Sequence, residues 1–95
     1  MPTTTGFFQT ESGSKYLQQL CKHFGHKVET SFDPHKGWVA FDMGTAHMTA
    51  NEEGLTVTAT VKDQEAVRVM HDVIDRHLEK FAFREADKKM VWTVD

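Results

Sequence analysis

The stretch Leu55-Thr56-Val57-Thr58-Ala59-Thr60-Val61 alternates apolar side chains with threonines along its whole length. Because successive side chains of a β-strand point to opposite sides of the sheet, this pattern predicts a strand with one apolar and one threonine-covered face. An apolar face must be buried against another layer, whereas a polar face tolerates solvent. The stretch therefore predicts a one-sided sheet with helices packed on one side only.

The residues before this stretch predict three more strands of the same sheet. Residues 28–33 and 45–50 alternate in the same way, and residues 37–43 place Val39 and Phe41 on the apolar side. Turn-forming residues with proline and glycine separate the segments, which predicts an antiparallel meander. The open face of this sheet is expected to carry Thr49, Thr56, Thr58, Thr60 and His47.

Two segments, residues 13–25 and 64–81, keep the spacing of amphipathic helices. We expect Ser12 or Ser14 to cap the first helix and Asp63 to cap the second, because their side-chain oxygens accept from free amides of the first turn. We expect Gly25 to end the first helix in the left-handed conformation. The apolar stripes are Tyr16, Leu17, Leu20, Cys21 and Phe24 on the first helix, and Ala66, Val67, Met70, Val73, Ile74, Leu78 and Phe81 on the second.

Short strands are also predicted at residues 5–10 and 90–94, which gives the order β-α-β-β-β-β-α-β. Two one-sided helices and one mostly antiparallel sheet share a core only if both helices pack on the apolar face of the sheet. The sequence therefore predicts an α+β two-layer sandwich. No repeat, low-complexity block or linker divides the chain, so we expect a single domain over residues 1–95.

The composition narrows the class of protein. With 39% hydrophobic residues and a formal net charge of -3, the chain fits a globular domain and lacks the strongly basic character of many nucleic-acid binders. The start has neither the basic region nor the apolar run of a signal peptide, and no apolar stretch is long enough to span a bilayer. The single cysteine cannot form an internal disulfide. We expect a cytoplasmic protein that binds neither nucleic acid nor membrane.

The segment from Cys21 to His26 holds three side chains that often bind metal ions. On a helix, Cys21 and His23 are two positions apart and point to nearly opposite sides, so they cannot bind one ion together. His23 and His26 are three apart and share a face if the helix continues past Gly25. Either they form a weak site for iron or zinc, or they only interact with the terminal carbonyl groups of the helix. Cys21 itself is expected to be a small buried side chain.

His77 is the second candidate, because the helical spacing places it near Ala66, Met70 and Phe81 on the buried stripe of the second helix. A buried imidazole needs a hydrogen-bond partner, which is either a backbone carbonyl or a side chain of the sheet. Alternatively, His77 lines a pocket between helix and sheet and acts there as a ligand or a proton acceptor.

Nothing else in the sequence points to a particular chemistry. The carboxylates Asp72, Asp75 and Glu79 are expected on the solvated side of the second helix, among basic residues. His71 lies at the margin of the apolar stripe without an evident partner. There is no glycine-rich phosphate loop, nucleophile motif or zinc-finger spacing. An enzyme would have to use His77 for proton transfer and Arg84 to hold an anion.

The segments YLQQLCKHFGHK (residues 16–27) and VIDRHLEKFAFRE (residues 73–85), with the closing VWTV, resemble the bacterial domain-of-unknown-function family 2218 over essentially the whole chain. The resemblance implies the same order of strands and helices. The family is similar to the N-terminal module of some siderophore-interacting flavoproteins, which implies a link to iron uptake but no reductase activity, since this sequence contains no flavin-binding portion. The family has no established catalytic residue, and the matching positions here are Tyr16, Leu17, Leu20, His23, His77, Leu78, Phe81 and Arg84.

Two functions remain open on this basis. The first is a non-enzymatic binding or accessory module linked to iron or siderophore metabolism, with a siderophore-interacting protein as its partner and an iron or zinc ion as its cofactor. Its candidate ligand-binding residues are His77, Tyr16 and Arg84, and its candidate metal ligands are His23 and His26. The second is a homodimeric interaction module that associates through the threonine-rich face of the sheet.

Overall fold

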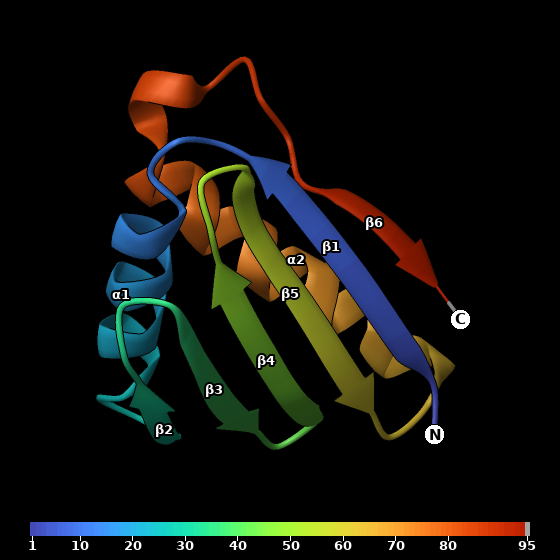
Figure 1. Ribbon diagram of the computed structural model, residues 1–95. Helices are drawn as coiled ribbons and strands as arrows, with labels where there is room; N and C mark the ends of the chain where they lie inside the picture. Colours follow the sequence, from blue (N-terminus) through green and yellow to red (C-terminus); the bar gives the residue numbers. More distant parts are fainter. Residues whose placement is uncertain (95) are drawn as a thin grey trace.

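The computed structural model describes residues 1–94, which form one six-stranded antiparallel sheet with two helices behind it (Figure 1). This architecture and the order of elements confirm the α+β prediction. The elements are β1 (Thr3–Gln9), α1 (Gly13–Phe24), β2 (Glu29–Phe32), β3 (Lys36–Phe41), β4 (Gly44–Ala50), β5 (Gly54–Val61), α2 (Gln64–Phe81), a short 3-10 helix η1 (Phe83–Glu85) and β6 (Val91–Val94).

The strands lie in the spatial order β2-β3-β4-β5-β1-β6, with every neighbouring pair antiparallel. The first strand therefore lies inside the sheet, where Gly6 is opposite Val57 on one side and Trp92 on the other. A Cβ atom on Gly6 would lie 2.8 Å from both the Met90 Sδ atom and the Trp92 ring. Glycine at this position thus makes room for the Trp92 ring on the helix side of the sheet.

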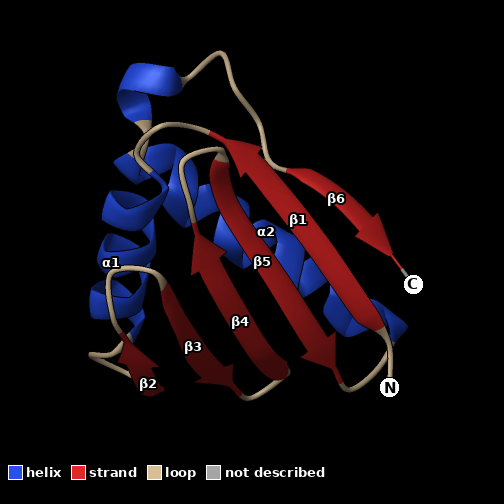
Figure 2. Cartoon of the chain, viewed as in Figure 1, coloured by secondary structure: helices blue, strands red, loops and turns tan. Residues whose placement is uncertain are grey.

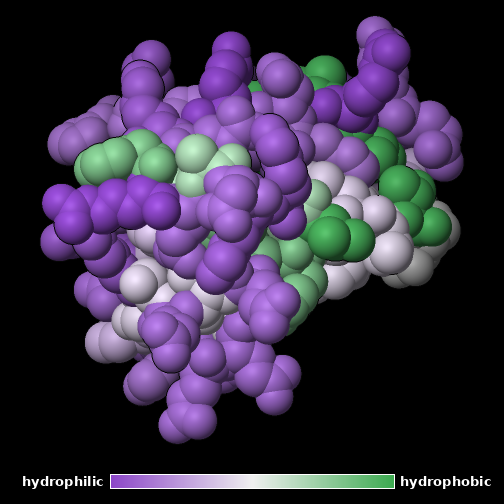
Figure 3. Space-filling model, turned by 90° about the horizontal axis from the view of Figure 1, so that it is seen from above, coloured by the Kyte–Doolittle hydropathy of each residue, from purple (hydrophilic) through white to green (hydrophobic). Residues whose placement is uncertain are grey.

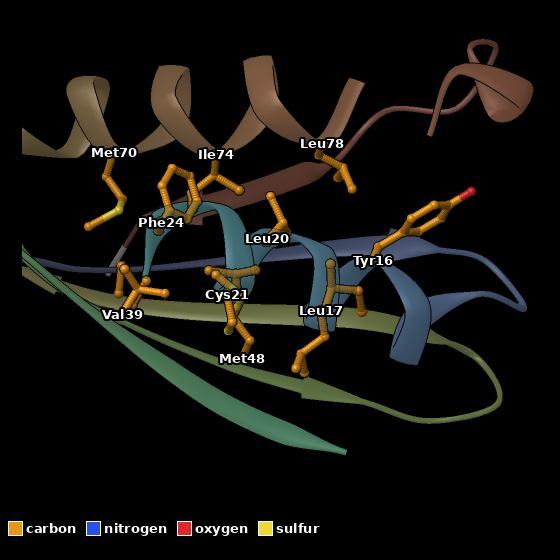
Figure 4. Close-up of a cluster of buried hydrophobic side chains, with 14 of the residues drawn as sticks. Tyr16, Leu17, Leu20, Cys21, Phe24, Val39, Met48, Met70, Ile74 and Leu78 are labelled. Atoms are coloured by element: carbon orange, nitrogen blue, oxygen red, sulfur yellow. The ribbon is translucent and has the colours of Figure 1, made fainter. Parts of the chain in front are cut away.

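The apolar face of the sheet and the stripes of both helices form one core, as predicted. The apolar residues of the stretch 55–61 are fully buried. Figure 4 shows that Leu17 and Cys21 of α1 point toward the sheet, whereas Leu20 and Phe24 point toward α2. Each fully buried side chain of this size contributes about 1.5–3 kcal/mol of hydrophobic stabilisation.

The helix ends confirm one prediction and contradict two. Asp63 caps α2, since its side chain accepts from the backbone N–H of Ala66 at 2.8 Å. Ser12 occupies the N-cap of α1, but its side chain makes no capping hydrogen bond. Gly25 ends α1 with right-handed dihedrals (φ -62°, ψ -14°), so the predicted left-handed ending is wrong. Crowding explains the glycine instead, because a Cβ atom would lie 2.9 Å from the hydroxyl oxygen of Thr30.

Both helices lie behind the sheet in Figure 2, and the face toward the viewer carries no helix. The predicted threonines and His47 point to this open face, together with Thr3, Thr5 and Phe7 of β1. Within residues 1–94, neither helix combines the length and the apolar character needed to cross a membrane.

Candidate functional site

Two predicted candidates from different helices, His23 and His77, lie side by side. Their ring centroids are 4.7 Å apart and the ring planes are inclined by 46°. His23 is exposed near the end of α1, and His77 is half-buried on α2. The ring of Phe24 contacts both imidazoles, at centroid distances of 5.4 Å and 4.8 Å. The packing of α1 on α2 thus brings together two imidazoles that are far apart in the sequence.

A backbone hydrogen bond fixes the position of the proton on His77. Its Nδ1 atom lies 2.6 Å from the carbonyl oxygen of Val73, one turn earlier in α2. A carbonyl oxygen only accepts, so Nδ1 carries the proton and Nε2 of the neutral ring holds the free lone pair. Metal-binding histidines commonly donate their second ring N–H to a backbone carbonyl in this way. The hydrogen bond to Val73 thus leaves Nε2 of His77 as the ring nitrogen that is free to bind a ligand.

The backbone carbonyl expected as the partner of His77 is confirmed. However, His77 does not lie at the centre of the buried stripe, where it was expected. The side chains at the centre of the buried stripe are Met70, Ile74 and Leu78. His77 lies beside them at the edge that faces α1, where it meets His23 and Phe24. The ring is thus partly open to solvent and accessible to a small ligand.

The environment of His23 favours its neutral form. Partial burial lowers the pKa of His23 below the ordinary histidine value, and the positive charges of Lys80 and Lys27, and those that His77 and His26 carry when protonated, act in the same direction. At pH 7 the ring is therefore neutral and offers a lone pair. The same basic groups oppose the binding of a bare cation.

The separation of the two rings suits coordination of one metal ion. With a metal–nitrogen bond of about 2.0–2.1 Å, and about 1.2 Å from a ring nitrogen to the ring centre, the centre of a coordinating ring lies about 3.2 Å from the ion. If both rings turned a nitrogen toward one ion, two centres 4.7 Å apart would correspond to a nitrogen–metal–nitrogen angle of about 95°, which lies between octahedral and tetrahedral values.

The predicted pairing of His23 with His26 depended on a helix that continued past Gly25. In the structure α1 ends at Phe24, and His26 is exposed in the turn that follows. Within residues 1–94, no group of three or more histidine, cysteine, aspartate or glutamate side chains is arranged to hold an ion. An ion at His23 and His77 would therefore need further ligands from water or from a bound molecule.

The other two ligand candidates lie near the opposite end of α1, where Tyr16 of α1 meets η1 and Arg84 is part of η1. The Tyr16 hydroxyl donates to the Glu85 carboxylate at 2.5 Å. The Thr10 hydroxyl and the Lys88 ammonium donate to the same carboxylate at 2.9 Å and 3.1 Å. Arg84 is exposed, with its guanidinium over the neighbouring Phe83 ring. Glu85 thus ties η1 to the start of α1, and the hydroxyl of Tyr16 is already engaged in this tie.

The pKa values of Tyr16 and Glu85 favour a neutral tyrosine next to an ionised carboxylate. Burial, then the hydrogen bond to Glu85 and its negative charge, raise the pKa of Tyr16 to about 12. The hydrogen bond from Tyr16 is the main cause that lowers the pKa of Glu85. In Figure 4 the Tyr16 hydroxyl points away from the hydrophobic cluster. Figure 3 shows that the surface at this end of the molecule is mainly hydrophilic.

A cavity of about 50 Å³ lies beside Glu85, between α2 and the segment that leads into β6. Its lining combines the apolar side chains of Phe8 and Met90 with the carboxylates of Asp75 and Glu79. Pockets for small molecules usually measure about 300–1,000 Å³, so this cavity accommodates a few water molecules rather than a substrate.

Sequence reasoning missed a third cluster, centred on His71. Its Nε2 atom lies 2.7 Å from the hydroxyl oxygen of the fully buried Thr4, which itself donates to the Thr93 carbonyl oxygen at 2.8 Å. A hydroxyl has only one proton to donate, so Nε2 of His71 must carry the proton of this bond. The His71 ring also stacks on Trp92, with centroids 4.1 Å apart and planes inclined by 19°.

Asp75 belongs to the same cluster, so its predicted place on the solvated side of α2 is wrong. Trp92 donates from Nε1 to the Asp75 carboxylate at 2.9 Å. Burial raises the pKa of Asp75 and lowers that of His71. Asp75 belongs to this cluster because β6 pairs with β1 and thereby brings Trp92 against α2. The cluster fastens the edge strand β6 to the helix.

Comparison with known proteins agrees with this fold. The family model described as "Uncharacterized protein conserved in bacteria (DUF2218)" matches residues 5–93. The NMR structure of PA4090 from Pseudomonas aeruginosa is similar, with a TM-score of 0.80 and 28% sequence identity over 98% of this chain and 96% of that chain. No curated protein matches. This chain therefore belongs to the DUF2218 family of uncharacterised bacterial proteins.

Proposed function

We propose that this chain is a non-enzymatic binding module of iron or siderophore metabolism, which holds a divalent transition-metal ion between α1 and α2. The observation that supports the proposal is the contact of two imidazoles from separate helices, His23 and His77, at a centroid distance of 4.7 Å. Imidazole nitrogen suits zinc, copper, nickel and iron, so Zn²⁺ and Fe²⁺ are the ions to test first.

The surroundings of the pair support binding rather than catalysis. The rings that contact it belong to Phe24 and Phe81, and the charged groups that act on His23 are basic. A phenyl ring has no basic group, and a protonated lysine has no free lone pair, so these groups supply neither a nucleophile nor a general base at pH 7. An imidazole pair in such surroundings fits the role of a ligand set.

The link to siderophores follows from the charge around the pair. Two protein ligands leave coordination positions open on any ion, and Lys27 and Lys80 oppose a bare cation. Anionic oxygen ligands on a bound chelator would fill the open positions and offset the positive charge. The chain would then receive the metal together with its chelator, with a siderophore-interacting protein as the partner that delivers or removes it.

Calorimetric and NMR titrations with Zn²⁺, and with Fe²⁺ without oxygen, test the metal site. We expect saturable binding of one ion per chain, and His23→Gln or His77→Gln should each weaken it about tenfold or more, since loss of a ligand costs at least as much as loss of a group that orients one. His26→Gln is the matched control and should bind as the wild type does. Binding that is lost in His26→Gln but retained in His77→Gln would contradict the proposal.

A further inference from the structure

One buried polar atom of α1 has no partner in the fold. The side-chain oxygen of Gln19 (Oε1) is buried, yet it makes no hydrogen bond with any group of residues 1–94. Among the side chains of these residues that are not exposed, it is the only buried nitrogen or oxygen atom in this state. Buried polar atoms of native proteins are normally hydrogen-bonded, so an unpaired one points to a partner from outside the chain.

The helical spacing places Gln19 beside the imidazole pair. Gln19 lies three residues after Tyr16 and four before His23, so the three side chains share one face of α1. The two neighbours show what this face meets. His23 contacts His77 of α2, and the Tyr16 hydroxyl contacts Glu85 of η1, directly after α2. Gln19 therefore lies between these two contacts, on the side of α1 that faces the end of α2.

The distance along α1 suits a ligand of an ion held by His23 and His77. Four residues of an α-helix rise by about 6 Å. An atom one bond beyond a metal-binding oxygen lies about 3 Å from the ion, and a hydrogen bond from that atom adds about 2.9 Å. A chelator on the ion can thus bring a donor that is next to its metal-binding oxygens within reach of Gln19.

The chemistry of the site defines this chelator further. The side-chain oxygen of glutamine only accepts, so its partner must carry an N–H or O–H group. Lys27 and Lys80 act on His23 with positive charge and favour anionic oxygens on the ion. A hydroxamate with a free N–H combines both features, because its N–H is next to its two metal-binding oxygens. A hydroxamate that is substituted on nitrogen lacks the donor.

We infer that Gln19 accepts a hydrogen bond from the chelator and thereby selects chelators that carry an N–H or O–H next to their metal-binding oxygens. The inference rests on the proposed metal site, but gives Gln19 a separate task, since the imidazoles bind the ion and Gln19 distinguishes its ligands. A site with a buried acceptor disfavours an analogue that lacks the donor, because the acceptor then stays unpaired.

Calorimetric titration of the Zn²⁺-loaded chain with acetohydroxamate and with N-methylacetohydroxamate tests the inference, because the two chelators differ at the N–H. We expect the ratio of their affinities to favour acetohydroxamate about fivefold more in the wild type than in Gln19→Leu, which corresponds to one hydrogen bond. Comparing the two ratios cancels the intrinsic difference between the chelators. The affinity for Zn²⁺ alone should be the same in both proteins.

Gln18→Leu is the matched control, because the Gln18 amide donates to Ser14 within α1. It should keep the wild-type ratio. Gln19→Leu removes no hydrogen bond of the fold, so its midpoint of urea unfolding should equal or exceed that of the wild type. A lower midpoint would show that the oxygen serves the fold and would overturn the inference.

The titrations also separate this inference from the metal site itself. Equal ratios in the wild type and Gln19→Leu, with zinc bound to both, would overturn the role of Gln19 and leave the site at His23 and His77 standing. A wild-type chain that binds no zinc would overturn both.

Discussion

His71 and His77 lie on one helix, less than two turns apart, yet the structure holds them in opposite tautomers. His71 donates from Nε2 to Thr4, whereas His77 donates from Nδ1 to the carbonyl of Val73. The free lone pair of His71 is therefore on Nδ1, close to its own backbone, and that of His77 is on Nε2, at the tip of the ring. The two hydrogen bonds, rather than burial, distinguish a structural histidine from a candidate ligand.

The surroundings of the two rings also distinguish a structural histidine, His71, from a candidate ligand, His77. His71 is stacked on Trp92 and bonded to a fully buried threonine, so it joins β6 to α2. His77 faces an exposed imidazole on the other helix. Substitutions around His71 should therefore change stability, and substitutions around His77 should change ligand binding with little effect on stability.

The largest effect is expected from Trp92→Ala. The substitution removes the stack on His71 and the hydrogen bond to Asp75. Because the indole is only half-buried, we expect the free energy of unfolding in urea to fall by about 2–3 kcal/mol, below the range for fully buried tryptophans. His77→Ala, measured alongside, should cost less than about 1 kcal/mol. Equal losses in the two variants would remove the contrast between the clusters.

Thr4→Val tests the tautomer of His71 directly. The substitution keeps the shape of the side chain but leaves the Nε2 proton of His71 without an acceptor, so we expect a loss of about 1–3 kcal/mol in thermal or urea unfolding. Thr5→Val, on the open face of the same strand, is the control and should stay within about 0.5 kcal/mol of the wild type. If Thr4→Val left the free energy of unfolding unchanged, the position of His71 would not depend on this hydrogen bond.

Tyr16→Phe should cost about 1.5 kcal/mol at neutral pH, since it removes a hydrogen bond to a carboxylate. The pKa of Glu85 is lowered in the fold, so the stability that it confers is present above its unfolded pKa and is lost as pH falls through the lowered value. The pKa of Tyr16 is raised to about 12, so its contribution is present below pH 10 and is lost as pH rises from there toward about 12. The difference between wild type and variant, measured by urea unfolding across pH, should therefore shrink at both extremes. A constant difference would show that Glu85 is not the partner.

The smallest effect is expected on the binding of Zn²⁺ as pH changes. Protons compete with the metal for imidazole nitrogen, and the lowered pKa of His23 delays this competition to pH values below the ordinary value of 6.5. Affinity measured by calorimetry should therefore be nearly constant between pH 7 and pH 8 and fall under acidic conditions. Affinity that rises on acidification would argue against imidazole ligands.

The order of elements could be predicted because each element carries its own periodic pattern. The alternation of residues 55–61 indicated both faces of the sheet, and the apolar stripe of α1 was confirmed residue by residue. The side chain of Asp63 was sufficient to predict the start of α2. These are local signals, and the packing agrees with them.

The candidate site depended on contacts that no local pattern specifies. A helical wheel gives the direction of His77 on its own helix, but not that His23 of α1 lies beside it. Asp75 was predicted to lie in solvent because its partner Trp92 reaches α2 only through the pairing of β6 with β1. This pairing joins the two ends of the chain, so no local pattern specifies it. Tyr16 matched the family pattern, but its bond to Glu85 depends on where η1 packs.

The most direct test of the account is a long-range ¹H–¹⁵N spectrum of the histidine rings during titration with Zn²⁺. Before metal is added, His77 should carry its proton on Nδ1 and His71 on Nε2. With metal, the Nε2 resonance of His77 and one ring nitrogen of His23 should shift together, at the same zinc concentration, while His71 stays unchanged. A His77 ring protonated on Nε2, or a zinc response confined to His26, would contradict the proposed site.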